Sequence, residues 1–353
     1  MVGPVNPRTS SLDPTGLLAS SAANKNNERR VMSLAKARTA VDRAFAESDK
    51  RGLAYENAFG GATSFLRRNY TKDLSGYDLA VTGVPFDQAV THRPGTRFGP
   101  RAIREASSLQ PFDPPIYWDD FDPLTEFAIA DYGDMAFDYA NVAGVPDLLH
   151  AHIKGILDQG CEAITLGGDH FITLPILRAY AEKYGPMSVI QFDAHSDLWP
   201  DDDMNRIDHG TMMYKAVKLG VVDVTRSVQI GIRTVCDDYL GMPFIDARTV
   251  HEKGCDWVVA EAKRLVGDAP TYISFDIDAL DPAYAPGTGT PVWGGLHSWQ
   301  AAAMLRDLAG INMVGGDCVE VSPPYDTTGA TAIAGAHVAM ELCCLNLWKK
   351  RKS

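Results

Sequence analysis

The chain has 353 residues, of which 45% are hydrophobic, and its formal net charge is −12 at pH 7. This length and composition are typical of an α/β protein with a large core and argue against a disordered chain. The acidic balance argues against a nucleic-acid partner, because no basic surface is available to neutralise phosphates. Acidic side chains can concentrate small cations near a cleft, although they also serve solubility alone.

Cysteine usage and hydropathy bear on the compartment. The six cysteines are scattered, and they form neither a C-x-x-C pair nor zinc-finger spacing. Such cysteines suit a reducing environment. No apolar run reaches membrane-spanning length, and the N-terminus lacks the apolar centre of a secretory signal. We therefore expect a cytoplasmic protein without a membrane partner.

Residues 1–75 are predicted to form an N-terminal arm and helix, and residues 76–353 one large domain. The arm begins with a stretch rich in Ser, Pro, Asn and Gly that has no apolar period. An amphipathic pattern over Glu28–Asp49 then predicts a helix. This helix packs either on its own domain or on another subunit, and Met32–Phe45 is the candidate for such a contact.

From Tyr77 onwards, short apolar runs alternate with longer helical stretches. The predicted strands are 79–84, 128–130, 163–166, 188–192, 228–232, 272–275 and 313–319. The predicted helices are 145–157, 174–184, 212–219, 256–265, 299–308 and 331–347. The strands are continuous apolar runs, as expected where both faces of a sheet are covered. We predict an α/β fold with three α/β/α layers and a mostly parallel sheet, in which ligands bind past the carboxyl ends of the strands.

Three groups of metal-ligating side chains each follow a predicted strand. The six residues are His170, Asp193, His195, Asp197, Asp276 and Asp278. Gly167 and Gly168 precede the first of them and allow a sharp turn, and the i, i+2 spacing of the last two puts both carboxylates on one face. Four carboxylates and two imidazoles favour Mn²⁺, Fe²⁺, Co²⁺ or Ni²⁺, and carboxylates can bridge two such ions. The pattern predicts a dinuclear metal site.

Each group alone has an ordinary structural explanation. A D-x-D pair is commonly a loop or a helix cap, and a G-G-D-H run by itself indicates little. Caps do not explain all three groups in order at strand ends. Four carboxylates converging on one point would repel each other without a cation. The metal site is therefore the better interpretation of the set.

These motifs resemble the ureohydrolase family of arginases, agmatinases, guanidinobutyrases and guanidinases, and most of all its agmatinase branch. The motifs that carry the resemblance are Gly167–His170, Asp193–Asp197, Ser274–Pro282, Val319–Pro323, Gly83–Asp87, Arg97–Arg104 and Pro286–Pro291. The resemblance covers roughly Tyr77–Leu347 and implies an arginase-like fold, so that residues 76–353 would be the catalytic domain. It also implies two divalent ions per subunit, Mn²⁺ or Ni²⁺, and a homo-oligomer of three or six subunits.

The resemblance assigns the ligands to two ions. One set is His170, Asp193, Asp197 and Asp276, and the other is His195, Asp193, Asp276 and Asp278. Asp193 and Asp276 would bridge.

The family pattern also implies a mechanism. Two ions supply hydroxide near neutral pH, and this hydroxide attacks the carbon of a guanidinium and releases urea. The expected catalytic residues are Asp197, His209 and Glu320. His209 would shuttle a proton to the leaving nitrogen, and Glu320 would grip the guanidinium NH₂ groups. A helix-capping histidine and a glutamate paired with an arginine are the plainer alternatives.

The substrate is less defined than the reaction. The loop Leu198–Asp208 departs from the agmatinase pattern and carries three consecutive acids that would attract cations, unless it is only a solvated loop. Trp293 stands where agmatinase-like sequences usually have an aliphatic residue, and its indole could cover a planar cation. Together with Glu320, we expect Trp293, His92 and Asp208 to contact substrate, while a core or interface tryptophan and a turn-capping histidine are the alternatives. Agmatine and a compact guanidine are both candidate substrates.

Three alternatives remain at this point. Guanidinases are associated with nickel and tend to carry an N-terminal extension, so a nickel-dependent hydrolase of metformin-type biguanides is one. A non-catalytic subunit of a hetero-oligomeric ureohydrolase is another, although the complete ligand set argues against it. A related hydrolase of formimino compounds or acetylated lysines is the third, and Glu320 favours a guanidinium over these.

Overall fold

The computed structural model describes residues 59–112, 118 and 121–351. All of them belong to one compact unit within residues 43–353. The predicted helix Glu28–Asp49 and the candidate contact Met32–Phe45 lie outside the described residues. The division of the chain at residues 75 and 76 stays a prediction.

Eight strands form one sheet, whose order is β2-β1-β3-β8-β7-β4-β5-β6. All seven strand pairings among the described residues are parallel, so the sheet is wholly parallel where a mostly parallel one was predicted. The strands are β1 (Leu79–Gly83), β2 (Ile129–Asp134), β3 (Glu162–Leu166), β4 (Ser188–Phe192), β5 (Val228–Ile232), β6 (Phe244–Asp246), β7 (Thr271–Asp276) and β8 (Met313–Val319).

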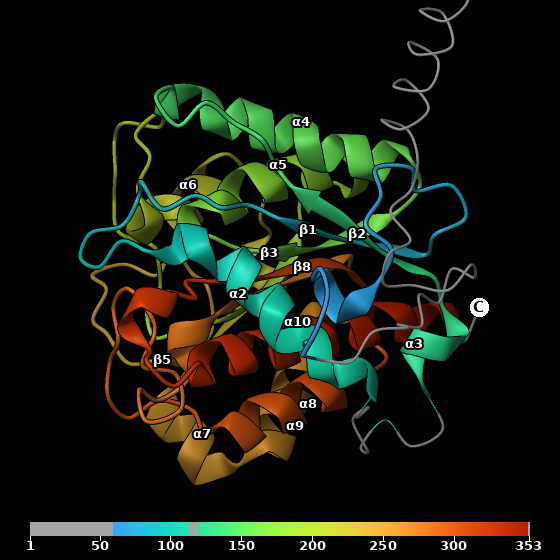
Figure 1. The fold of residues 1–353 in the computed structure, drawn as a ribbon. Coiled ribbons are helices and arrows are strands. Elements are labelled where there is room, and N and C mark those ends of the chain that lie inside the picture. The colour runs from blue at the N-terminus through green and yellow to red at the C-terminus, as the bar shows by residue number, and fades with distance from the viewer. Residues whose placement is uncertain (1–58, 113–117, 119–120, 352–353) are drawn as a thin grey trace, which may run out of the picture. The chain divides into compact units, whose positions relative to one another are not determined.

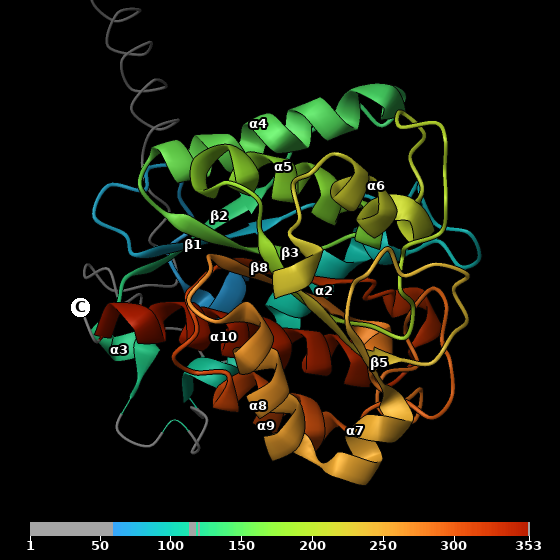
Figure 2. The same cartoon turned by 180° about the vertical axis from the view of Figure 1, so that it is seen from behind.

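Helices cover both faces of this sheet. On one face lie α4 (Val145–Asp158), α5 (Thr173–Tyr184) and α6 (Met212–Lys218), and the two opposite views agree on this (Figures 1 and 2). The other face carries α2 (Gly99–Ala106), α3 (Pro123–Glu126), α7 (Ala247–Lys253), α8 (Cys255–Val266), α9 (Ser298–Asp307) and α10 (Ala330–Arg351). The predicted three-layer α/β/α fold is confirmed.

The buried strands explain why both helical layers form. Every residue of β4 is buried, as is every residue of β7 and β8. Leu79 and Val81 of β1 pack into the core on the α10 side, whereas Ala80 between them packs into the core on the α4 side. Burying one large apolar side chain stabilises a fold by about 1.5–3 kcal/mol, so two continuous cores account for a stable sheet.

The sequence missed some elements. The strands β4, β5 and β8 have the predicted bounds, but β6, α7 and α2 were not predicted. β6 has only three residues, and α2 begins with Gly99 and Pro100, so neither shows a clear apolar period.

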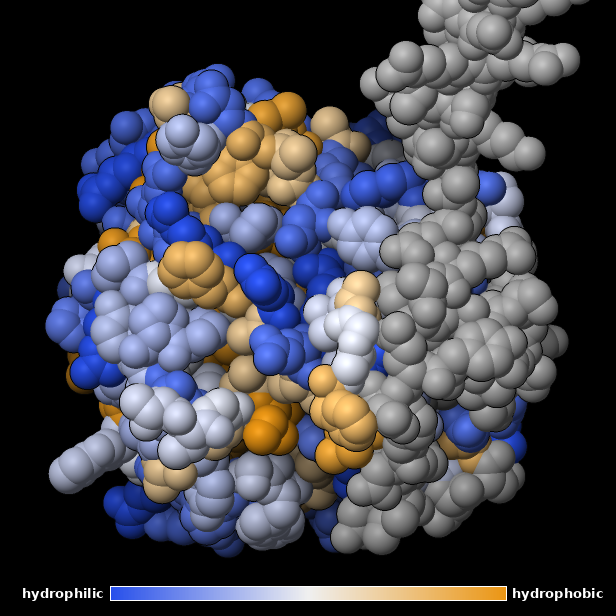
Figure 3. Space-filling model, viewed as in Figure 1, coloured by the Kyte–Doolittle hydropathy of each residue, from blue (hydrophilic) through white to orange (hydrophobic). Residues whose placement is uncertain are grey.

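Helix α10 corrects the expectation that no segment reaches membrane-spanning length. Its 22 residues include a window of mean hydropathy 1.4, and 72% of that window is buried inside the fold. It packs beneath the sheet, as the core helix of a globular domain does. On the face that Figure 3 shows, hydrophilic side chains separate the apolar patches, and the described residues form no continuous apolar band there.

Four neighbouring strands in the middle of the sheet carry the predicted site. β3, β8, β7 and β4 are adjacent in that order, and each is followed by one of the predicted motifs. β7 and β8 are inserted between β3 and β4, so that β1 and β2 lie outside β3 on one side, and β5 and β6 lie outside β4 on the other. In open parallel sheets this is the point at which ligands bind, past the carboxyl ends of the strands.

Candidate metal centre

The turn after β3 brings His170 to the sheet edge. A Cβ on Gly168 would lie 2.0 Å from the carbonyl oxygen of Phe86, so only glycine fits there. Neither Gly167 nor Gly168 has a positive φ. The two glycines therefore serve close backbone approach, where a sharp turn had been expected. His170 then opens a short 3-10 helix, His170–Ile172, and its side chain is buried.

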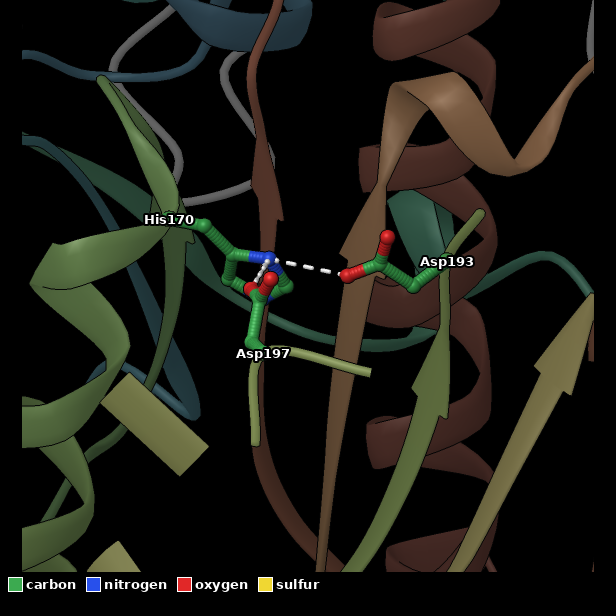
Figure 4. Close-up of side chains that lie close together, drawn as sticks. All are labelled: His170, Asp193 and Asp197. Carbon is green, nitrogen blue, oxygen red and sulfur yellow. Dashed lines mark ion pairs between the residues drawn. The ribbon is translucent and has the colours of Figure 1, made fainter. Parts of the chain in front are cut away.

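Three carboxylates converge on one nitrogen of His170. Its Nδ1 lies 2.9 Å from Oδ2 of Asp197, 3.1 Å from Oδ2 of Asp193 and 3.2 Å from Oδ2 of Asp276. Figure 4 shows the ion pairs that join this nitrogen of His170 to the carboxylates of Asp193 and Asp197. This Nδ1 is buried and makes no well-aligned hydrogen bond to any described residue. A buried nitrogen surrounded by carboxylate oxygens is the arrangement that a cation would complete.

A second cluster shares Asp193 with the first. Nδ1 of His195 lies 3.1 Å from Oδ2 of Asp278 and 3.5 Å from Oδ1 of Asp193. In each cluster, His170–Asp193–Asp197 and Asp193–His195–Asp278, the ligand atoms lie within 4.8 Å of one another. The six predicted ligands therefore come together, with Asp193 common to both clusters. Asp276 lies beside His170, and a bridging role for it stays a prediction.

The protonation of the cluster reflects its excess of negative charge. Burial would lower the pKa of His195, but the charges and hydrogen bonds of Asp278 and Asp193 outweigh it and raise that pKa to about 12. The pKa of His170 is likewise raised well above its ordinary value, against burial, by the carboxylates around it. Burial and the neighbouring charges of Asp278 and Asp193 raise the pKa of Asp276 well above its ordinary value. Protons held on His170, His195 and Asp276 thus balance part of the negative charge of the carboxylates, and in this way they meet a demand for positive charge.

Divalent ions would meet that demand without the protons. Carboxylate oxygens with two imidazole nitrogens suit Mn²⁺, Fe²⁺, Co²⁺ or Ni²⁺, and the six cysteines of the chain are absent from both clusters. Metal binding requires neutral imidazole and ionised carboxylate, so it would displace the protons that the raised pKa values hold. The residues present fit a dinuclear centre.

Two site residues adopt a backbone conformation that L-residues rarely use. Asp197 has φ 53° and Glu320 has φ 63°. The carbonyl of Asp197 accepts hydrogen bonds from Met213 N and Tyr214 N at 3.1 Å each, which secures the turn onto α6. Such residues each cost of order 1–3 kcal/mol and persist where surrounding contacts hold them. Their place at the ends of β4 and β8 indicates that side-chain direction matters there.

Glu320 and His209 form a buried pair beside the first cluster. Oε1 of Glu320 accepts hydrogen bonds from His170 N and from His209 Nδ1, both at 2.9 Å. Its Oε2 is buried and has no hydrogen-bond partner among the described residues. A Cβ on Gly289 would lie 3.1 Å from that Oε2, so the glycine keeps space open beside it. One carboxylate oxygen is thus committed and the other is free for a ligand.

The surroundings of His209 suit a group that gains and loses a proton. Burial would lower the pKa of His209, but the hydrogen bond and charge of Glu320 outweigh it and raise that pKa to about 9. On the other side of the ring, Nε2 lies 3.2 Å from Thr91 N and 3.0 Å from Thr91 Oγ1. The amide can donate to a neutral Nε2, and the hydroxyl can accept from a protonated one. Sequence reasoning missed Thr91, because nothing in its own motif marks it.

A buried polar row lies under the metal ligands. The register of the five central strands aligns Thr165, Asp317, Ser274, Gln191 and Gln229 side by side, and all five are buried. Nε2 of Gln191 donates to Oδ2 of Asp193 at 2.7 Å, and Nε2 of Gln229 donates to Oε1 of Gln191 at 2.8 Å. Sequence reasoning missed this row as well. Its signal was a polar residue two places before a ligand inside an apolar strand.

The predicted substrate-contacting residues do not converge on one point as the six metal ligands do. Asp208 caps the 3-10 helix His209–Thr211, where its Oδ1 accepts from Gly210 N, and its Oδ2 accepts from Arg206 Nη2. His92 is exposed beside Thr91 in the loop that contacts His209. Trp293 is 87% exposed, which is not a core position. Its loop is held by Arg233, whose Nη2 donates to Val292 O at 2.8 Å.

The three consecutive acids after Asp197 do not act alike. Asp201 is buried, and its Oδ2 lies 2.8 Å from Nζ of Lys215, a lysine whose side chain is fully buried. Asp202 and Asp203 are exposed. The loop thus presents two outward carboxylates, and the third anchors it to α6. Its attraction for cations is smaller than the sequence alone indicated.

A sequence model of the arginase family matches residues 77–344. The chain belongs to the arginase family. An agmatinase of Chromobacterium violaceum is 49% identical over 310 residues, which span 88% of this chain and 96% of the relative. An agmatinase of Proteus mirabilis is 45% identical over 296 residues, spanning 83% of this chain and 95% of that one. The resemblance noted in the sequence is confirmed.

Solved structures agree with the family. A hypothetical agmatinase from Burkholderia thailandensis superposes with a TM-score of 0.85 at 50% identity, over 88% of this chain and 98% of that one. Proclavaminate amidino hydrolase from Streptomyces clavuligerus gives 0.78 at 34% identity, over 83% and 99% of the two chains. The arginase-like fold is confirmed, and the chain is a hydrolase that acts on amidines. Arginase-family enzymes depend on two metal ions, and the two clusters are the candidate ligands here.

Proposed function

We propose that this protein is an agmatinase, which hydrolyses agmatine to urea and 1,4-diaminobutane at a dinuclear metal centre. The observation that carries the proposal is the unpartnered Oε2 of Glu320, buried beside the ligand clusters. A carboxylate in this position suits a planar guanidinium, which it can bind through parallel N–H···O bonds. The choice of agmatine is supported by relatives named agmatinase at 49% and 45% identity.

The metal ligands in this proposal are the six residues of the two clusters, with Mn²⁺ or Ni²⁺ as the ions. Two divalent ions, when bound, lower the pKa of a bound water to a value near neutral pH, and so supply a hydroxide nucleophile. Asp197 contributes through its carboxylate on the His170 side, at 2.9 Å from Nδ1. Its strained backbone directs that carboxylate into the cluster.

Glu320 orients the substrate. Because its Oε1 is held by His170 N and His209 Nδ1, the free Oε2 has a fixed direction beside the centre. The guanidinium would donate to it, which holds the electron-poor carbon over the ligand clusters and reduces the entropy lost at the reacting step. Burial strengthens this charge pair because little water screens it.

His209 supplies the proton to the leaving nitrogen. With a pKa of about 9, its ring is the positively charged imidazolium at neutral pH, with both nitrogens protonated. Thr91 can accept from Nε2 before the transfer and donate to it afterwards. A general acid of this kind contributes typically 10²- to 10⁴-fold to a rate.

Substrate contacts beyond the guanidinium are proposed for Asp208, His92 and Trp293. The exposed indole of Trp293 is available to cover a planar cation or to pack on another subunit. If it covers the site, it would favour a compact guanidine over the longer agmatine. The homo-oligomer of three or six subunits and the cytoplasmic location are part of the same proposal.

A panel of guanidino compounds tests the proposal. Purified protein, stripped of metal and reloaded separately with Mn²⁺ and Ni²⁺, is incubated with agmatine, guanidine, dimethylguanidine, metformin, guanidinobutyrate and arginine, and urea is measured. We expect agmatine to give the highest kcat/KM. Metformin hydrolysis with nickel would instead support the biguanide alternative, and preference for guanidine would support a guanidinase. Two bound ions without urea or amine from any compound would refute an enzyme of this class, or assign the chain to a non-catalytic partner subunit.

A further inference from the structure

A hydrogen-bonded chain runs from His170 to a buried carboxylate in the neighbouring strand. Nε2 of His170 lies 2.8 Å from Oγ of Ser274, and that hydroxyl donates to Oδ1 of Asp317 at 2.7 Å. All three side chains are buried. Ser274 is on β7 and Asp317 is its register partner on β8, so the sheet itself sets the distance between them.

The other oxygen of Asp317 fixes the direction of this chain. Oδ2 accepts from Thr173 Oγ1 and from Tyr272 Oη, each at 2.8 Å. With three hydroxyls donating to it, the carboxylate serves only as an acceptor. The proton of Ser274 therefore points to Asp317, which leaves the lone pairs of Oγ to accept from His170. His170 then carries its proton on Nε2.

This direction has a consequence at the opposite ring nitrogen. A neutral imidazole with its proton on Nε2 has its lone pair on Nδ1, and Nδ1 is the atom that three carboxylates surround. A hydrogen bond to the second nitrogen of a ligating histidine fixes the tautomer and raises the basicity of the ligand. Here a serine relays that effect from a carboxylate in the adjacent strand.

His195 has no matching arrangement. Its Nδ1 faces Asp193 and Asp278, and its second ring nitrogen makes no hydrogen bond to any described residue. Its side chain is 22% exposed, whereas that of His170 is 1% exposed. Water is therefore the available partner for the second nitrogen of His195. The two clusters differ in how their imidazoles are held.

We propose that Ser274 and Asp317 are positioning residues that hold His170 in its metal-ligating tautomer, and that they serve the His170 half of the centre alone. The inference rests on the metal centre proposed above. Loss of such a supporting hydrogen bond typically weakens metal binding roughly 10- to 100-fold. The effect should therefore appear in the affinity for one ion and not for the other.

Single-ion backgrounds separate the two halves. His195→Ala should leave one Mn²⁺ bound at the His170 cluster, and His170→Ala should leave one at the His195 cluster. Mn²⁺ affinity is measured by equilibrium dialysis against graded free metal, without any substrate. In the first background, Ser274→Ala and Asp317→Asn should each raise the Kd for Mn²⁺ by roughly 10- to 100-fold. In the second background, the same changes should leave the Kd unchanged.

Two further variants separate positioning from general damage. Ser274→Thr keeps the hydroxyl and should restore the Kd in the His195→Ala background. Thr173→Val removes a different hydrogen bond from Asp317 and should leave that Kd unchanged. Thermal unfolding of each metal-free variant checks that it is folded.

Three results would overturn the inference. They are an unchanged Kd after Ser274→Ala in the His195→Ala background, an equal rise in both backgrounds, and a rise after Thr173→Val as large as that after Ser274→Ala. A parent chain that binds no ion would instead refute the proposed metal centre itself, so the two failures are distinguishable.

Discussion

Replacement of Glu320 by glutamine isolates the charge that the proposed mechanism needs. Glutamine keeps an oxygen that can accept from His170 N and His209 Nδ1, so the fold around β8 should persist. It lacks the negative charge that Oε2 offers to a guanidinium. Glu320 is 1% exposed, so water cannot screen or replace the lost pair.

The magnitude follows from the burial of the pair. Removing one member of a buried, hydrogen-bonded charge pair costs about 2–5 kcal/mol, and each 1.4 kcal/mol is tenfold. Glu320→Gln should therefore lower kcat/KM for agmatine by roughly 30- to 4,000-fold. The variant should show both a lower kcat and a higher KM, because the same contact binds and orients the substrate.

The pH profile should change as well. His209 has a pKa of about 9 because Glu320 outweighs burial. The protonated ring is the proton donor, so activity should fall as pH rises through about 9 in the parent enzyme. Without the charge of Glu320, burial is opposed only by the smaller contributions of Asp197 and Asp169, so the alkaline limb of kcat/KM should move to lower pH than in the parent enzyme.

Stability gives a check on the sign of this shift. A histidine whose folded pKa is raised stabilises the fold fully below its unfolded pKa and loses that contribution as pH rises through the folded value. The destabilisation by Glu320→Gln in the metal-free protein should therefore be largest below about pH 6.5 and smaller above about pH 9. Thermal unfolding across this range measures it.

A matched control lies on α10. Glu341 is also 1% exposed, and its carboxylate accepts from Trp118 Nε1 and Arg306 Nη2, away from the clusters. Glu341→Gln should leave kcat/KM and the pH profile unchanged. Urea release under initial-rate conditions is the assay for both variants. If Glu320→Gln retains parental kcat/KM and its alkaline limb, the role assigned to Glu320 and the origin of the His209 pKa are both refuted.

Four further predictions address other parts of the site. Asp193→Asn should abolish binding of both ions and urea release, and retained turnover would contradict the shared-ligand assignment. Mn²⁺ binding near pH 8 should release about one proton from His195, whose pKa is about 12 without metal, so affinity should rise with pH; no proton uptake by weak buffer would contradict this. Thr91→Val should lower kcat by about 2- to 12-fold with KM little changed, as expected for a lost hydrogen bond of 0.5–1.5 kcal/mol, whereas a change in KM alone would point to substrate contact. Trp293→Ile should favour longer substrates if the indole covers the site, while an unchanged substrate profile would support a packing role.

The sequence was sufficient for residues whose type and spacing carry their chemistry. His170, Asp193 and Asp278 could be predicted because ligand-type side chains at the ends of buried parallel strands must meet at one sheet edge. The fold followed from the same continuous apolar runs. Resemblance to a known family then gave the reaction class, which the comparisons confirmed.

Other features depend on three-dimensional register and could not be read from spacing. Asp317 lies beside Ser274 only because β7 and β8 pair, although they are more than forty positions apart in the sequence. Thr91 reaches His209 from a loop 118 positions away. Asp201 looked like one of three equivalent acids until Lys215 proved to be buried against it. In each case the tertiary fold determines which residue the side chain contacts.

The exposure of Trp293 shows a different limit. A tryptophan in a glycine-containing loop can cover a ligand, pack in a core or pack at a subunit interface, and the residue type alone does not decide among them. The structure removes the core alternative, because the indole is 87% exposed. The remaining two require a substrate or an assembled oligomer to distinguish.

The most direct test of the central claim is urea formed from agmatine as a function of the number of ions bound per chain. The metal-free protein is titrated with Mn²⁺, bound metal is counted, and urea is measured at each point. A two-ion hydrolase should release no urea without metal and reach full activity at two ions per chain. At the same metal loading, Glu320→Gln should release urea only at its lowered rate. Two bound ions and no urea from agmatine or any other guanidino compound would contradict the account.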